Sequence, residues 1–204
     1  MKGNAGRQLP PDVNPETLSR LSPIRREELG EGQQKSYDAA MARPAGGLNL
    51  AGLKGPGGVW IRFPQLGPHM GAMNRILRSE LDLDPRLVEV AILATAREMD
   101  SQFEWSMHEP VALKEGVAPE TVEAIKHRQA LSGVPEKEAV LIELAREAVG
   151  AKKVGPATYA RAIAALGEKG VLNFVALISA YAMTAIVLSV FDQQLHDGQE
   201  ALLP

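Results

Sequence analysis

The chain has 204 residues, of which 45% are hydrophobic and 23% charged, and its formal net charge is −3 at pH 7. This balance is typical of one globular domain, with or without an extension, and gives no electrostatic reason to bind nucleic acid. The absence of cysteine excludes disulfides, thiolate metal ligands and thiol redox chemistry. The first residues lack the apolar stretch of a signal peptide, so we expect a cytoplasmic protein.

The amino-terminal third of the sequence carries few helical signals. Residues 1–23 are rich in Pro, Gly and Asn and predict an extended arm. Residues 24–83 predict a helical extension, in which an amphipathic helix over 31–41 precedes a Gly/Pro-rich loop over 43–58. The glycines of this loop match neither a phosphate-binding nor a dinucleotide-binding spacing, so we interpret it as a surface loop.

From residue 64 onward the sequence predicts helices almost without interruption, and no alternating β-branched run predicts a strand. Prolines in first turns and glycines after last turns mark the ends of these helices. The expected helices cover 64–80, 85–99, 102–115, 119–129, 136–150, 156–167 and 170–191. The predicted fold class is therefore all-α, with residues 84–204 as the main helical domain.

The last predicted helix needs a separate explanation. Residues 171–191 contain no charged side chain, and their length alone would allow a membrane span. However, polar residues such as Asn173 and Thr184 interrupt the segment, and acidic rather than basic residues follow it. We interpret it as a buried or subunit-interface helix and expect no membrane contact.

Two predicted helices hold the side chains best suited to acid–base chemistry. Glu89 stands in the middle of a helix that is apolar on nearly every side. It meets a partner at a helix crossing, lines a closed pocket, or forms a surface ion pair with Arg86 or Arg97. Glu104 and His108 stand four residues apart and therefore share one face of the next helix, either as a catalytic pair or as a solvated one.

Other residues near this pair also have structural explanations. Ser101 is a predicted N-cap, with Glu104 completing a capping box, and Pro110 is expected to bend the helix just past His108. The four histidines show no metal-ligand spacing, and we expect no metal. An iron site made of Glu89, Glu104 and His108 is the one conceivable exception.

Several residues of this region agree in order and spacing with a known family. They are Glu89 in its apolar helix, the run Glu104-Trp105-x-x-His108-x-x-x-Ala112-x-x-x-Gly116, and the following Pro119-Glu120-x-Val122. Together they resemble the carboxymuconolactone decarboxylase family, which includes alkylhydroperoxidase D. The resemblance covers about residues 84–191 and implies an alkylhydroperoxidase D-like helical bundle with an amino-terminal extension.

The resemblance also indicates which branch of the family is relevant. In the peroxidase branch, a glutamate and a histidine relay protons for two cysteines. Glu89 and His108 match those two residues, whereas Ser101 and Glu104 occupy the cysteine positions. Peroxidase activity is therefore not expected. The decarboxylase branch has a glutamate four residues before its histidine, as this chain does.

The resemblance thus implies a cofactor-free carboxy-lyase that acts on a small carboxylated unsaturated lactone or a related acid of aromatic-compound catabolism. An arginine would bind the substrate carboxylate, and tryptophans would form an apolar wall. The candidate catalytic residues are His108, Glu104 and Glu89, and the candidate substrate-binding residues are Arg62, Trp60, Arg97 and Trp105.

Two other functions stay open at this point. One is a non-catalytic binding or scaffold member of the family, and the other is a cofactor-free hydratase, isomerase or lactone hydrolase on the same fold. Members of the family assemble as trimers or hexamers. The resemblance therefore implies a homo-oligomer (dimer, trimer or hexamer), in which residues 171–191 suit an interface as well as a core.

Overall fold

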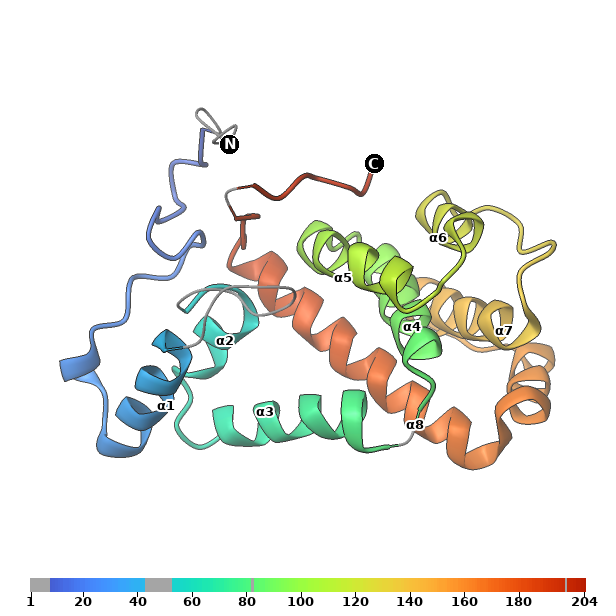
Figure 1. Cartoon of the computed structure of the whole chain (residues 1–204), viewed down its shortest axis with the longest axis horizontal. Helices are drawn as coiled ribbons and strands as arrows, with labels where there is room; N and C mark the ends of the chain where they lie inside the picture. Colours follow the sequence, from blue (N-terminus) through green and yellow to red (C-terminus); the bar gives the residue numbers. More distant parts are fainter. Residues whose placement is uncertain (1–7, 43–52, 82, 197) are drawn as a thin grey trace. The chain divides into compact units, whose positions relative to one another are not determined.

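The computed structural model describes residues 8–42, 53–81, 83–196 and 198–204 (Figure 1). These residues form helices and loops, with a single antiparallel bridge between Asn14 and Ser19. The prediction of an all-α fold is confirmed. The chain divides into two compact units, one made of Met1–Met73 with Val187–Glu200 and the other of Asn74–Ile186 with Ala201–Pro204.

The first unit contains α1 (Glu31–Met41), α2 (Gly55–Trp60) and most of α3 (Gly67–Arg75). Its start and its end are joined by backbone hydrogen bonds. The N–H of Arg20 donates to the carbonyl of Phe191 at 2.8 Å, and that of Gln194 donates to the carbonyl of Leu18 at 2.7 Å. The segment directly after the last helix, up to Glu200, is therefore part of the amino-terminal unit.

Helix α2 lies partly in the segment that the sequence predicts to be a loop. That prediction is wrong for residues 55–58, while residues 43–52 of the predicted loop lie outside the described residues. Pro56 fits the first turn because its missing N–H is not needed there. A Cβ atom on Gly58 would lie 2.0 Å from the carbonyl oxygen of Leu53, so this close approach of the backbone requires glycine.

The second unit is built around one buried helix. Its elements are η2 (Ile76–Glu80), α4 (Pro85–Glu98), α5 (Gln102–Lys114), α6 (Pro119–Lys126), α7 (Glu136–Ala145), η3 (Arg146–Gly150) and most of α8 (Pro156–Val190). Helix α4 packs against α5, α6, α7 and η3, and every residue from Leu87 to Ala96 is buried. Asp84 caps α4 by accepting a hydrogen bond from the N–H of Arg86 at 2.9 Å.

Helix α8 spans the last two helices that the sequence predicts. The predicted break coincides with a kink at Gly167, where φ is 69° and ψ is 166°. Among the described residues, α8 is the one helix long and apolar enough to cross a membrane, and 39% of its most apolar 18-residue window is buried. This is weak evidence for a membrane span, because core helices of soluble proteins have the same length and composition.

The kink at Gly167 gives a stability prediction. Gly167→Ala is expected to lower the free energy of unfolding by about 1–3 kcal/mol, because these backbone angles are essentially restricted to glycine. Urea unfolding followed by circular dichroism measures the change. The control is Gly71→Ala in α3, where an added methyl group meets open space, and it is expected to raise stability by up to about 1 kcal/mol. Unchanged stability of Gly167→Ala would show that the kink does not need glycine.

Candidate functional site

Helices α4 and α5 position the three predicted catalytic side chains inside the second unit. Glu89, in the middle of α4, is 2% exposed, whereas Glu104 and His108 of α5 are 3% and 6% exposed. Burial rules out a solvated surface pair of Glu104 and His108. It also rules out a surface ion pair for Glu89.

Glu89 joins three elements of the second unit. One of its carboxylate oxygens, Oε2, lies 2.7 Å from Nδ1 of His108, and the other, Oε1, accepts a hydrogen bond from Nη2 of Arg78 at 3.0 Å. Arg78 belongs to η2, a π-helical turn that continues α3. The arginines that the sequence offers as partners bond elsewhere, Arg86 with Glu138 and Arg97 with Asp100.

His108 is held as a neutral imidazole with a defined orientation. The pKa of His108 is lowered, chiefly by burial. The hydrogen bond and the charge of Glu89 oppose this shift, and the charge of Arg78 adds to it. Since Glu89 also accepts from Arg78, we assign Nδ1–H of His108 as the donor in the contact with Glu89. In that tautomer Nε2 of His108 carries a lone pair and acts as an acceptor.

Glu104 has a different environment from Glu89. Both of its carboxyl oxygens are buried and have no hydrogen-bond partner among the described residues. Burial raises the pKa of Glu104 to about 8, and the nearby Ser101 hydroxyl opposes the shift without reaching hydrogen-bond geometry. At neutral pH Glu104 is therefore mainly a carboxylic acid. The predicted capping box does not form: Ser101 occupies the N-cap position, but its side chain makes no cap hydrogen bond, and Glu104 is buried instead.

Tyr181 of α8 belongs to the same group of side chains. Its ring meets that of His108 edge-on, with centroids 5.2 Å apart and planes at 83°. Burial raises the pKa of Tyr181, the charge of Arg78 lowers it, and the charges of Glu89 and Glu104 raise it. We call Arg78, Glu89, Glu104, His108 and Tyr181 the acid–base cluster.

The sequence interpretation missed two members of this cluster. Nothing in the sequence distinguishes Arg78 from Arg75 three residues earlier, which forms an exposed ion pair with Glu80. Tyr181 carried a usable signal, since it is the one tyrosine in the charge-free segment 171–191.

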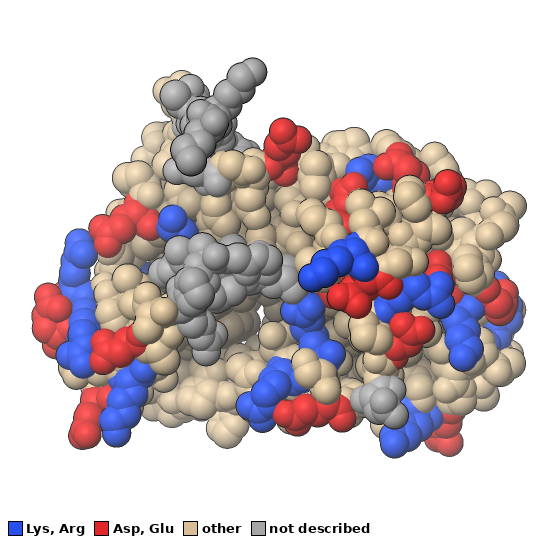
Figure 2. Space-filling view, viewed as in Figure 1, with Lys and Arg blue, Asp and Glu red and all other residues tan. Residues whose placement is uncertain are grey.

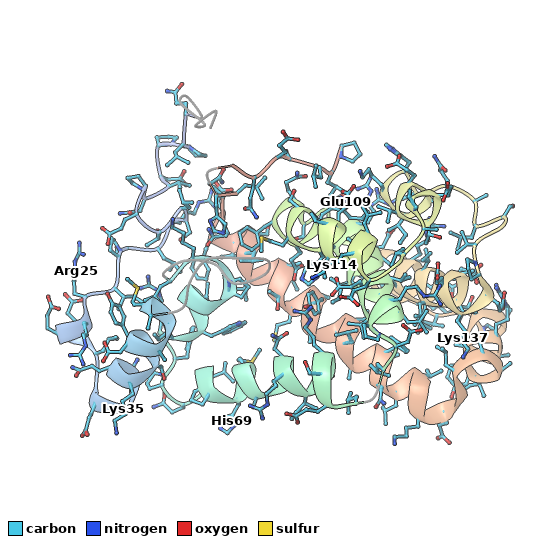
Figure 3. The ribbon with its side chains drawn as sticks, viewed as in Figure 1. Arg25, Lys35, His69, Glu109, Lys114 and Lys137 are labelled. Carbon is cyan, nitrogen blue, oxygen red and sulfur yellow. The ribbon has the colours of Figure 1, made fainter. Side chains whose placement is uncertain are left out.

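The predicted substrate-binding residues of the second unit have internal partners. Arg97 donates from Nε to the carbonyl of Lys126 at 2.6 Å and pairs with Asp100. Trp105 is fully buried, and its indole N–H donates to Glu109, which also binds Nζ of Lys126 at 2.9 Å. Figure 3 labels Glu109 on α5, one turn after Trp105.

Trp60 and Arg62 belong to the first unit. The guanidinium of Arg62 donates to the carbonyl groups of Gly58 at 3.1 Å and Ser22 at 2.5 Å. The ring centroid of Trp60 lies 6.4 Å from that of Phe63. The contacts recorded for both residues are thus within their own unit.

Ion pairs on the surface contrast with the buried cluster. Figure 2 shows basic and acidic side chains interspersed on one face of the molecule. Arg161 of α8, for example, binds Glu136 at 3.0 Å and Glu143 at 2.5 Å. Exposed pairs of this kind contribute little to stability.

In the part of the chain that the structure describes, no group of three or more His, Asp or Glu side chains is arranged to hold a metal ion.

The raised pKa of Glu104 predicts a pH-dependent stability. Between pH 4.5 and about 8 the folded protein binds this proton more tightly than the unfolded chain, so the free energy of unfolding falls as pH rises. We expect the difference in this free energy between wild type and Glu104→Gln to change by about 1 kcal/mol per pH unit. Urea unfolding between pH 6.5 and about 8 measures it, and comparing the two proteins cancels the titration of His108, which both contain.

The matched control is Glu115→Gln at the exposed end of the same helix. Its stability is expected to follow that of the wild type at every pH. Parallel curves for wild type and Glu104→Gln would mean that Glu104 is ionised in the folded protein at neutral pH.

Comparison with known proteins shows which family part of the chain resembles. The model of the carboxymuconolactone decarboxylase family matches residues 64–147, which include Arg78, Glu89, Glu104 and His108. Searches of curated proteins and of solved structures gave no significant match. The matched segment starts earlier and ends earlier than the resemblance over residues 84–191. Residues 64–147 are thus similar to the carboxymuconolactone decarboxylase family, and the chain contains no cysteine.

Proposed function

We propose that this protein is a cofactor-free acid–base lyase that decarboxylates a small carboxylated unsaturated lactone or a related acid. The family supports a role of this kind, and the acid–base cluster supplies side chains suited to it. The observation that carries the proposal is the burial of Glu104, whose two carboxyl oxygens have no hydrogen-bond partner among the described residues and whose pKa burial raises to about 8. A group that holds its proton at neutral pH and releases it near that pH is suited to general acid catalysis.

The proposed reaction requires a proton and a place for negative charge. When the C–C bond to the carboxylate breaks, CO₂ leaves, and the bonding electrons delocalise through the ring double bond onto the lactone carbonyl oxygen. One proton then bonds to a ring carbon and completes the product. A buried site with hydrogen-bond donors lowers the barrier by stabilising the developing oxyanion.

We assign the proton transfer to Glu104. His108, one helical turn away, presents Nε2 as an acceptor and is suited to exchange a proton with Glu104. Glu89 orients the His108 ring through Nδ1, and Arg78 in turn holds Glu89. The raised pKa of Tyr181 keeps its hydroxyl protonated, so this group is available as a donor to the oxyanion.

The substrate carboxylate also needs a cation. Arg62 and Arg97 stay proposed ligands for it, and Trp60 and Trp105 stay proposed pocket walls. Both guanidinium groups already bond to protein oxygens, so either arginine would have to exchange these partners for substrate.

We further propose a cytoplasmic homo-oligomer. Exposed apolar side chains on α8 support association, with Leu172 68% exposed and Ile186 54% exposed. The dimer, trimer and hexamer are all compatible with this surface, and analytical ultracentrifugation separates them.

The direct test of the proposal is turnover of a panel of γ-carboxylated unsaturated lactones, followed by CO₂ release. Glu104→Gln and His108→Gln are each expected to lower kcat by about 100-fold to 10,000-fold, since each removes a proton-transfer group. Glu115→Gln and His127→Gln, both at exposed positions, are the controls and should keep wild-type rates.

Other outcomes point to other functions. A wild-type protein that releases no CO₂ from any member of the panel would contradict the lyase proposal. Conversion of the lactones without CO₂ release would indicate a hydratase, isomerase or lactone hydrolase instead. Binding without any conversion would indicate a non-catalytic member of the family.

A further inference from the structure

Arg78 has a free bonding position beside the acid–base cluster. Among the ion pairs of the described residues, it is the one Lys or Arg that contacts a carboxylate of this cluster. Only one such contact is made, from Nη2 to Glu89 at 3.0 Å, although a guanidinium carries five N–H donors. Its Nε atom is buried and has no hydrogen-bond partner among the described residues. An unpaired buried donor of a charged group is costly, and a bound acceptor would remove that cost.

A second unpaired group belongs to the same cluster. Both carboxyl oxygens of Glu104 are buried without a partner in the described part of the chain. Contacts link the two unpaired groups: Arg78 bonds to Glu89, Glu89 contacts His108, and Glu104 lies one turn before His108 on α5. In its protonated form Glu104 is a hydrogen-bond donor, as are the Nε–H of Arg78 and the hydroxyl of Tyr181.

A set of donors that includes one fixed positive charge is complementary to an anion. A carboxylate fits best, because a guanidinium binds it through short charge-assisted hydrogen bonds. The Arg78 side chain is 23% exposed and so borders solvent, whereas Glu104 is buried. Its position in a π-helical turn agrees with the frequent occurrence of such turns at functional sites.

We propose that Arg78, through its unpaired Nε–H, binds the carboxylate of the substrate and so determines the specificity for carboxylated lactones. This assignment rests on the proposed lyase function for its substrate and differs from the assignment to Arg62 or Arg97. Arg78 contacts Glu89 and the ligand at once, and it therefore couples the occupied site to the orientation of His108.

The test uses a saturated lactone carboxylate, which cannot form the delocalised anion and therefore stays intact, together with its methyl ester. Calorimetry on the 204-residue chain is expected to show binding of the acid, and Arg78→Gln should weaken this binding by about 30-fold or more. Arg78→Lys, which keeps the charge without the planar fork, should recover part of the affinity. Arg75→Gln removes an exposed arginine one turn earlier and should bind like the wild type. The ester should bind wild type and Arg78→Gln equally weakly.

A second measurement does not depend on whether Arg78→Gln folds. In wild-type protein labelled with ¹⁵N-arginine, the acid is expected to shift the Nε–H resonance of Arg78, and the ester is expected to leave it unchanged. Equal affinity of wild type and Arg78→Gln for the acid would overturn the assignment, as would an unshifted resonance at saturation or the absence of acid binding. Failure of the lyase proposal would give a different result. The protein would still bind the saturated acid through Arg78 but would release no CO₂ from unsaturated lactones.

Discussion

The second unit depends on how the buried carboxylate of Glu89 is compensated. A carboxylate in the middle of a fully packed helix is costly unless each oxygen has a partner. Glu89 receives one partner from α5, His108, and one from η2, Arg78. These two contacts connect the central helix with the elements before and after it. They also set the tautomer of His108 and the orientation of its ring.

The three buried glutamates of this unit differ in their partners, and the difference separates structure from chemistry. Glu138 binds Arg86 and accepts a hydrogen bond from Thr121 at 3.2 Å, so its charge is satisfied inside the protein. Glu89 is also satisfied, through the imidazole of His108 and the guanidinium of Arg78. Glu104 has no partner among the described residues and a pKa of about 8. Carboxyl groups with environments this different are suited to different roles in one acid–base reaction.

The sequence predicts the helices of the second unit well, because their apolar periodicity and their end signals agree. Pro85, Pro119 and Pro156 each stand at a first turn, as the sequence indicates. The short helix α2 is missed because its glycines lower the helical propensity, while backbone packing against Leu53 is invisible in the sequence.

The candidate site is predictable only in part. Glu89, Glu104 and His108 follow from a charge in an apolar helix and from helical spacing. The sequence does not predict that Arg78 is the partner of Glu89. Arg86 and Arg97 are closer to Glu89 in the sequence, and only the tertiary packing selects among the three arginines. The capping box fails for a related reason. Local signals place Glu104 at the helix start, but its side chain is buried.

The proposed lyase function depends on one property, that Glu104 holds a proton at neutral pH inside the folded protein. Its most direct test is a pH titration of the side-chain carboxyl by ¹³C NMR, with the resonance assigned by its loss in Glu104→Gln. The structure predicts a midpoint near pH 8. A midpoint near 4.5, the value of an unperturbed carboxyl, would show that Glu104 is ionised at neutral pH and would contradict its role as the proton donor.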